Sequence, residues 1–117
     1  MEDWNGVKAY AKYGKFKIGD ERAQYRLDVG SYSGTAKDSL SDHNNMAFST
    51  KDRDNDRWSN NCAVTFSGAW RFKHCHQSNL NGKYLGEKVD RRGVTWYYFK
   101  ETYLSLKFAE MKLRPAS

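Results

Sequence analysis

A long tract of this chain, from Asn44 to about Gly93, is rich in asparagine, aspartate, serine and glycine. Apart from Cys62 to Phe66, it has almost no apolar run long enough to form a strand. Such a tract buries too little apolar surface to offset the entropy lost when its backbone becomes ordered. We therefore expect something other than a hydrophobic core, such as a bound metal or a cross-link, to order it.

The segment before this tract alternates apolar and polar residues, as half-buried strands do. From Val7 to Ile18 the alternation breaks at Gly14 and then resumes, which predicts either a pair of strands or one bent strand. The alternating run Gln24–Val29 predicts a second strand, and the turn-rich residues 30–34 end it.

Two further stretches complete the predicted architecture. Thr35 is a suitable N-cap for a short helix over residues 36–42. Strand character returns over Val94–Phe99 and Tyr103–Leu113, and we expect both stretches to rejoin the sheet. The length and the absence of a linker or repeat indicate one domain.

The composition restricts the class of protein. Aromatic residues make up 15% of the chain, and disordered chains are poor in them. The net charge of +6 attracts anionic partners, but basic and acidic residues are interleaved and no nucleic-acid motif is present. No apolar run approaches the roughly 18 residues of a membrane span. Met1 leads directly into a folded-type sequence, so we expect the natural beginning to lie further upstream.

The strongest local signal is the run of alternating carboxylates at Asp52, Asp54 and Asp56. Calcium takes several oxygen ligands, and carboxylates one residue apart in a loop can converge on one ion. An EF-hand needs glycine and glutamate where this chain has Arg57 and Ala63, so that motif is excluded. The alternative is a solvated acidic turn.

The two cysteines, Cys62 and Cys75, have two interpretations. A disulfide between them closes a loop of about 14 residues and contributes about 3 kcal/mol in the chain-entropy model. The other interpretation is a zinc site with His74 and His76, but three consecutive ligands converge poorly on one ion and no Cys-x-x-Cys spacing is present. The disulfide interpretation implies an oxidising compartment.

No catalytic constellation is visible in the sequence. A search for a nucleophile with a base, or for a paired acid and base, finds only unremarkable serines and the carboxylates already assigned to the calcium loop, so we expect no enzymatic activity. His76 follows Cys75 and lies near Phe66 and Phe72 in the chain, where it can either line a small pocket or serve as a structural histidine.

Together these features resemble the fibrinogen-related domains of ficolins, tachylectins, tenascins, angiopoietins and the fibrinogen chains. The stretches that carry the resemblance are Tyr32–Leu40, Phe48–Asp56, Asn61–Ala63, Gly68–Trp70, Cys75–His76, Ser78–Tyr84 and Glu110–Pro115. The resemblance covers essentially the whole chain but only the later half of the family's domain. It implies an α+β fold with a small antiparallel sheet and a large irregular region ordered by calcium. It also implies a single partial domain, with residues 1–43 and 94–115 as the sheet part and residues 44–93 as the calcium- and ligand-binding loop part.

The resemblance also implies site residues. In the family a calcium ion is held by two aspartates and nearby carbonyls. By position these are the side chains of Asp54 and Asp56 and the carbonyl groups of Trp58 and Asn60, with Asp52 as a neighbour.

The family bridges the cysteines that match Cys62 and Cys75. It often has a cis peptide before the second, here His74–Cys75, which makes the amide of Cys75 a candidate ligand donor.

In the sugar-binding members an acetyl group sits beside the calcium, between positions that match Phe66, His76 and the loop before Gly93. This chain departs from that pattern, because the loop is shorter and because Asp90, Arg91 and Thr102 stand where those lectins have aromatic and small residues. Basic residues surround the predicted pocket and suit an anionic ligand, or else form a solvated basic face: Arg71, Lys73, Arg91 and Arg92.

We therefore expect a secreted, calcium-dependent recognition module that binds glycans or anionic microbial surface ligands, as a lectin does. The alternative is a matrix or signalling module that binds a protein partner, because the ending Phe108–Pro115 is most similar to tenascins. In either case we expect oligomerisation through an upstream region, since a single weak site needs avidity.

Overall fold

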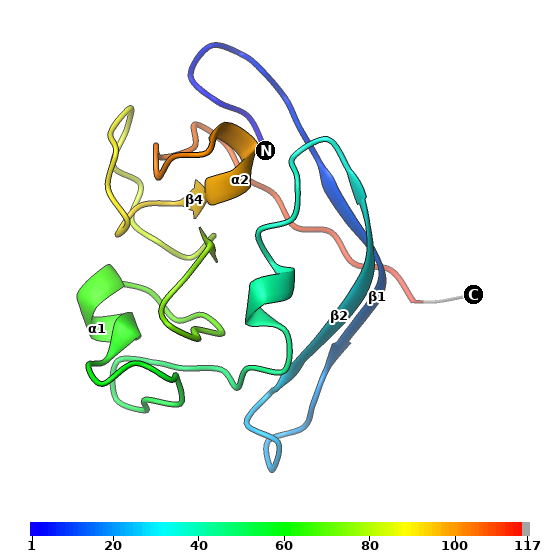
Figure 1. Ribbon diagram of the computed structural model, residues 1–117, viewed down its shortest axis with the longest axis vertical. Helices are drawn as coiled ribbons and strands as arrows, with labels where there is room; N and C mark the ends of the chain where they lie inside the picture. Colours follow the sequence, from blue (N-terminus) through cyan, green and yellow to red (C-terminus); the bar gives the residue numbers. More distant parts are fainter. Residues whose placement is uncertain (116–117) are drawn as a thin grey trace.

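One side of the molecule is an antiparallel hairpin of two strands, β1 (Ala11–Ile18) and β2 (Leu27–Gly34). In the computed structural model, which describes residues 1–115, most of the remaining chain lies beside this hairpin as irregular loops and short elements (Figure 1). The strands pair in continuous register, with Tyr13 opposite Tyr32 and Phe16 opposite Val29. The predicted α+β class with small antiparallel sheets is confirmed.

The interruption predicted at Gly14 is a change of face within one continuous strand. Tyr13 and Phe16 are both partly buried against the core although they are three residues apart. Opposite Gly14, Ser31 has a left-handed backbone with φ of 56°, and a Cβ at Gly14 would lie 3.0 Å from the Ser31 Cβ. The left-handed residue shifts the alternation by one position, so both ends of the hairpin face the core.

The second strand lies later in the chain than predicted. Gln24 and Tyr25 both have φ of 55° and belong to the turn, so β2 begins at Leu27 and continues through the residues predicted to be a turn. The helix predicted over residues 36–42 is also wrong, because the structure has only a 3-10 turn, η1 (Ser41–His43). Thr35 does not cap a helix; its hydroxyl oxygen accepts a hydrogen bond from the Tyr10 amide at 3.2 Å.

The apolar run at Cys62 is a helix and not a strand. Helix α1 (Cys62–Phe66) begins after Asn61, whose side-chain oxygen accepts a hydrogen bond from the Val64 amide at 3.2 Å. It ends at Ser67, which has a left-handed backbone. An asparagine N-cap and a left-handed C-cap together define the two ends of this short helix.

A second small sheet pairs β3 (Ser78–Asn79) with β4 (Thr95–Trp96), and helix α2 (Tyr97–Lys100) follows at once. The prediction that residues 94–99 and 103–113 rejoin the hairpin sheet is therefore wrong. Beyond α2 the chain makes isolated antiparallel bridges, from Leu104 to Val89 and from Phe108 to Glu2.

The core lies between β2 and the irregular part. Its fully buried side chains include Leu27 on β2 and Phe72, while Trp96 on β4 is nearly buried. Trp96 also donates a hydrogen bond from its indole N–H to the Lys37 carbonyl at 2.8 Å, which connects β4 to the segment that follows β2. Within residues 1–115, no helix has the length and apolar character needed to cross a bilayer.

Candidate functional site

Three aromatic side chains from separate segments form an open box, which we call the aromatic cage: Phe66, His76 and Tyr103. Phe66 ends α1, His76 precedes β3, and Tyr103 follows α2. The rings of Phe66 and Tyr103 are nearly perpendicular to the His76 ring, at 90° and 89°, with centroids 5.1 and 5.4 Å from it. The two outer rings are therefore walls, and the His76 ring is the floor between them.

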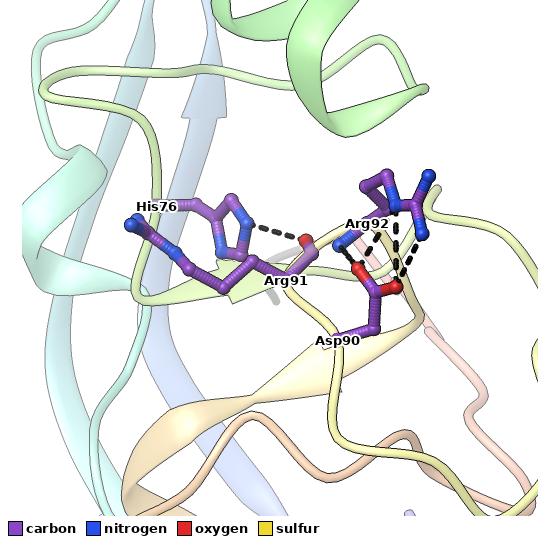
Figure 2. A network of polar contacts seen from close by, with 4 residues as sticks. All are labelled: His76, Asp90, Arg91 and Arg92. Atoms are coloured by element: carbon purple, nitrogen blue, oxygen red, sulfur yellow. Dashed lines mark hydrogen bonds and ion pairs between the residues drawn. The ribbon is translucent and has the colours of Figure 1, made fainter.

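Arg91 fills this cage. Its guanidinium carbon lies 4.8 Å from the centroids of both Phe66 and Tyr103, which makes two cation–π contacts. Its main-chain carbonyl accepts a hydrogen bond from His76 Nε2 at 2.8 Å. Figure 2 shows the Arg91 side chain extending from this carbonyl past the His76 ring, away from the neighbouring pair Asp90 and Arg92.

His76 is a neutral floor for the cage. The residue is only 3% exposed, and burial together with the charge of Arg91 lowers the pKa of its imidazole to about 3. Since Nε2 carries the proton that bonds the Arg91 carbonyl, Nδ1 is an acceptor. This buried Nδ1 finds no hydrogen-bond partner in the described part of the chain. The Tyr103 hydroxyl donates to the His76 carbonyl at 3.0 Å and fixes the wall against the floor.

Asp90, predicted as a ligand-binding residue, instead uses its carboxylate for hydrogen bonds that stabilise its own loop. Its carboxylate accepts hydrogen bonds from the Arg92 amide at 2.9 Å and from the Arg92 guanidinium at 2.6 Å (Figure 2). The hydrogen bonds and charge of Arg92 hold the pKa of this carboxyl well below its usual range. The Asp90 amide donates to the Tyr103 carbonyl at 3.1 Å, so the turn is also tied to the cage wall.

The predicted basic rim is mostly occupied by internal contacts. Arg71 donates to the Tyr25 carbonyl at 3.0 Å and lies over the Phe48 ring, and burial lowers its pKa. Lys73 lies 3.8 Å from the Asp42 carboxylate, and Arg92 is paired with Asp90.

Within residues 1–115 neither Arg71 nor Arg91 makes an ion pair. Arg71 donates a hydrogen bond to a carbonyl, whereas the guanidinium of Arg91 contacts only two aromatic rings, so Arg91 is the rim cation whose hydrogen-bond donors remain available to a partner.

The acidic loop contains two neighbouring carboxylates, Asp54 and Asp56. Asp56 accepts hydrogen bonds from the amides of Trp58 at 2.9 Å and Cys62 at 3.0 Å, which anchors it to the start of α1. Asp54 accepts from the Asp56 amide at 3.1 Å. Partial burial and the nearby Asp54 carboxylate raise the pKa of Asp56. Asp52 instead accepts from the Thr50 hydroxyl at 2.6 Å and does not join them.

The donor set of this loop fits a hard cation only with help from the backbone. No ion pair within residues 1–115 engages Asp54 or Asp56, so no positive side chain relieves their repulsion. The same residues contain no cluster of three or more histidine, cysteine or acidic side chains that could hold a metal. Calcium accepts carbonyl oxygens as well, and the carbonyl groups of Trp58 and Asn60 stay the predicted remaining ligands.

The acidic loop and the cage are in contact through one side chain. The ring of Trp58 stacks on Phe66 with centroids 6.2 Å apart, at 28°. Because the Trp58 amide is also bonded to Asp56, the conformation of the acidic loop positions one wall of the cage.

Cys62 and Cys75 form the predicted disulfide, with Cα atoms 5.2 Å apart. The predicted cis peptide at His74–Cys75 is wrong, because no peptide bond in residues 1–115 is cis; Cys75 instead has a left-handed backbone with φ of 65°. The disulfide connects α1 to the segment that leads into His76, so it joins a wall of the cage to the floor.

Sequence reasoning missed Tyr103 and His43. The alternation predicts a strand at Tyr103, although its neighbour Thr102 is among the residues that the resemblance puts at the pocket. His43 is fully buried, bonded through Nδ1 to the Arg71 carbonyl at 2.9 Å, and its Nε2 accepts from the amides of Gln77 and Ser78. Isolated aromatic and histidine residues carry no spacing signal, and only the fold brings these two beside the cage.

Comparison with known proteins identifies the family. Residues 1–116 match the C-terminal globular domain of fibrinogen beta and gamma chains. This chain belongs to the fibrinogen C-terminal domain family. The domain is a non-enzymatic module, which confirms the prediction that the chain is not an enzyme.

Among relatives of this fibrinogen-like chain, chicken tenascin-R is 52% identical over 107 residues, which are 92% of this chain and 8% of tenascin-R. Chicken tenascin is 50% identical over 112 residues, 96% of this chain and 6% of tenascin. The solved fibrinogen-like globe domain of human ANGPTL2 superposes with a TM-score of 0.85 at 41% identity, covering 92% of this chain. The chain spans 51% of that solved domain.

Proposed function

We propose that this chain is a protein-recognition module of an extracellular matrix or signalling protein. The observation that carries the proposal is Arg91 in the aromatic cage. A charged side chain of the protein itself occupies the space where a small acetylated ligand would be held. What remains at the surface is a cation flanked by aromatic rings, and arginine and aromatic residues are enriched in protein–protein interfaces.

The relatives support the same reading. Tenascins are extracellular-matrix proteins, and the ANGPTL2 globe shares the fold. The lectin reading receives less support, because the cage is filled and three of the four rim cations are engaged internally. By analogy with the tenascins, we place the protein outside the cell, where its disulfide is stable.

The acidic loop is proposed to bind calcium through Asp54 and Asp56. Calcium there would neutralise two adjacent carboxylates and draw the loop toward the start of α1, to which Asp56 is already bonded. Support comes from the raised pKa of Asp56 beside Asp54 and from the lack of any cationic side-chain partner within the described residues. Its role would be structural, holding Trp58 against the cage wall.

The chain is further proposed to be the later half of a fibrinogen-like domain, since it spans about half of the solved domains it matches. The predicted division into a sheet part, residues 1–43 and 94–115, and a loop part, residues 44–93, belongs to this proposal. An oligomer formed through other regions of the full protein would then supply avidity.

The test is a cell-surface binding experiment with the chain displayed on multivalent beads in calcium buffer. Matrix-producing cells are treated with trypsin, with a mixture of glycosidases, or with buffer, and the beads are also applied to an array of acetylated and sulfated glycans. Protein recognition predicts binding that trypsin removes and glycosidases leave intact, with a silent array. Binding that follows the glycosidases or appears on the array would establish the lectin reading instead.

A further inference from the structure

Arg91 is held at its backbone and much less firmly at its side chain. Its carbonyl is bonded to His76, and the loop around it is fixed by the Asp90–Arg92 pair and by the Lys83 amide, which donates to the Arg92 carbonyl at 2.8 Å. The guanidinium, in contrast, makes only the two ring contacts and belongs to an exposed residue. The side chain can therefore rotate out of the cage while the main chain stays in place.

The cage that Arg91 would leave has a definite chemistry. Its walls are the apolar faces of Phe66 and Tyr103, and its floor is a neutral imidazole. The buried acceptor Nδ1 of His76 has no partner within residues 1–115, and in Figure 2 the Arg91 side chain runs along that side of the ring. An emptied cage would accept an apolar or aromatic side chain.

The chemistry of Arg91 determines which ligand group could displace its side chain from the cage. A planar guanidinium forms its strongest contacts with carboxylates, which it binds through two parallel hydrogen bonds, and these exceed exposed contacts with aromatic rings. The net charge of +6 favours the approach of acidic surfaces. A carboxylate at the rim would thus compete with the rings for the guanidinium.

We propose that Arg91 is an exchangeable plug, and that the partner is an acidic protein segment that pairs a carboxylate with the withdrawn guanidinium and inserts an adjacent apolar side chain into the cage of Phe66, His76 and Tyr103. This inference rests on the proposed function, because it specifies how a protein partner is recognised. It also explains why a side chain of the protein itself fills the cage on a recognition surface. The rings of Phe66 and Tyr103 stay covered until a segment binds that carries both a carboxylate and an adjacent apolar side chain.

The test uses three small probes with the same ring and different charges: phenylacetate, benzyl alcohol and benzylammonium. Each is titrated into the calcium-loaded chain while the ring signals of Phe66, His76 and Tyr103 are followed by NMR. We expect phenylacetate to shift these signals and to bind at least threefold more tightly than benzyl alcohol, with benzylammonium weakest. If phenylacetate leaves the three rings unshifted, the proposal is wrong.

The variant Arg91→Ala removes the plug and the guanidinium together. It should bind benzyl alcohol at least as tightly as the natural chain does, and it should lose the preference for phenylacetate. Arg53→Ala, an exposed arginine in the acidic loop, is the matched control and should keep that preference. A preference for phenylacetate that survives in Arg91→Ala would show that the carboxylate binds elsewhere.

These probes involve no protein partner, so the outcome is independent of the cell-surface experiment. If phenylacetate opens the cage but the chain binds no cells, the proposal for Arg91 stands and the proposed protein-recognition function is wrong. If the probes shift no ring signals and Arg91→Ala leaves trypsin-sensitive cell binding unchanged, the protein-recognition function stands and the proposal for Arg91 is wrong.

Discussion

The histidines in this chain differ because of where the fold places them. His43 is completely buried and uses both ring nitrogens, His76 is buried as the floor of the cage, and His74 between the core segments is exposed. Burial disfavours the charged imidazolium and lowers the pKa of both buried rings, to about 3 for His76. Their neutral form is therefore required by the folded state.

This requirement predicts that stability falls in mild acid. In the unfolded chain a histidine takes up its proton near pH 6.5, whereas the folded chain resists until a much lower pH. The free energy of unfolding should be flat above pH 6.5 and should decrease below it, by about 1.4 kcal/mol per pH unit for each buried histidine. Urea denaturation between pH 7.5 and 4.5 measures this slope.

His43→Gln and His76→Gln should each reduce the slope, whereas His74→Gln should leave it unchanged. An equal slope in all three variants would mean that carboxylates and not the buried histidines govern acid stability.

Gly82 is a second residue whose role depends on the tertiary structure. A Cβ at this position would lie 2.2 Å from the Gly93 carbonyl oxygen and 2.7 Å from that of Arg92. Gly82→Ala should therefore displace the loop that carries Arg91 and lower stability by about 1–3 kcal/mol, the usual cost of overpacking. Thermal unfolding checks this. Gly86→Ala has open space around its Cβ, and only backbone strain at φ of 74° should affect it.

At the scale of elements, the short helix α1 organises the site. It presents Phe66 as a cage wall, begins where the Cys62 amide binds Asp56, and is held to the chain before His76 by the disulfide. A five-residue helix has little stability of its own, so its position depends on these attachments.

The disulfide can be removed to test this dependence. The double variant Cys62→Ser, Cys75→Ser should lose about 3 kcal/mol of unfolding free energy, as expected for a loop of this length. Chemical denaturation of the oxidised natural chain, of the reduced natural chain and of the variant provides the measurement. The reduced natural chain should behave like the variant; if both match the oxidised chain, the bridge does not hold α1.

At the scale of the whole molecule, the irregular half is expected to depend on calcium. An ion that binds only the folded state raises stability by RT ln(1 + [Ca²⁺]/Kd), about 2.7 kcal/mol at a hundredfold excess over Kd. Thermal unfolding in calcium and in excess chelator should therefore differ, and Asp54→Asn or Asp56→Asn should abolish the difference.

Asp52→Asn provides the matched control for the calcium prediction, because its carboxylate is bonded to Thr50 and lies outside the pair. It should retain the calcium response. A response lost equally in all three variants would indicate a general charge effect and not a site formed by Asp54 and Asp56.

The flat shape of the molecule, 42 × 39 × 18 Å, results from a hairpin beside an irregular half (Figure 1). That division could be predicted, because the alternating residues before Asn44 favour strands and the polar tract after it does not. The predicted helix over residues 36–42 failed because Asp38 accepts hydrogen bonds from the Leu40 and Ser41 amides, which form a turn in place of helix.

The sequence by itself determined the α+β class, the cysteine pair, the acidic run and the family, since each depends on residue type and local order. The tertiary structure alone decided that Cys62–Phe66 is a helix, that β4 pairs with β3, and that Arg91 fills a cage with Tyr103 as a wall. These outcomes depend on contacts between segments far apart in the chain. The conformational preference of a five-residue stretch contributes less free energy than one buried disulfide or one helix cap does. The Arg91 guanidinium contacts its aromatic rings only after the fold has brought them together.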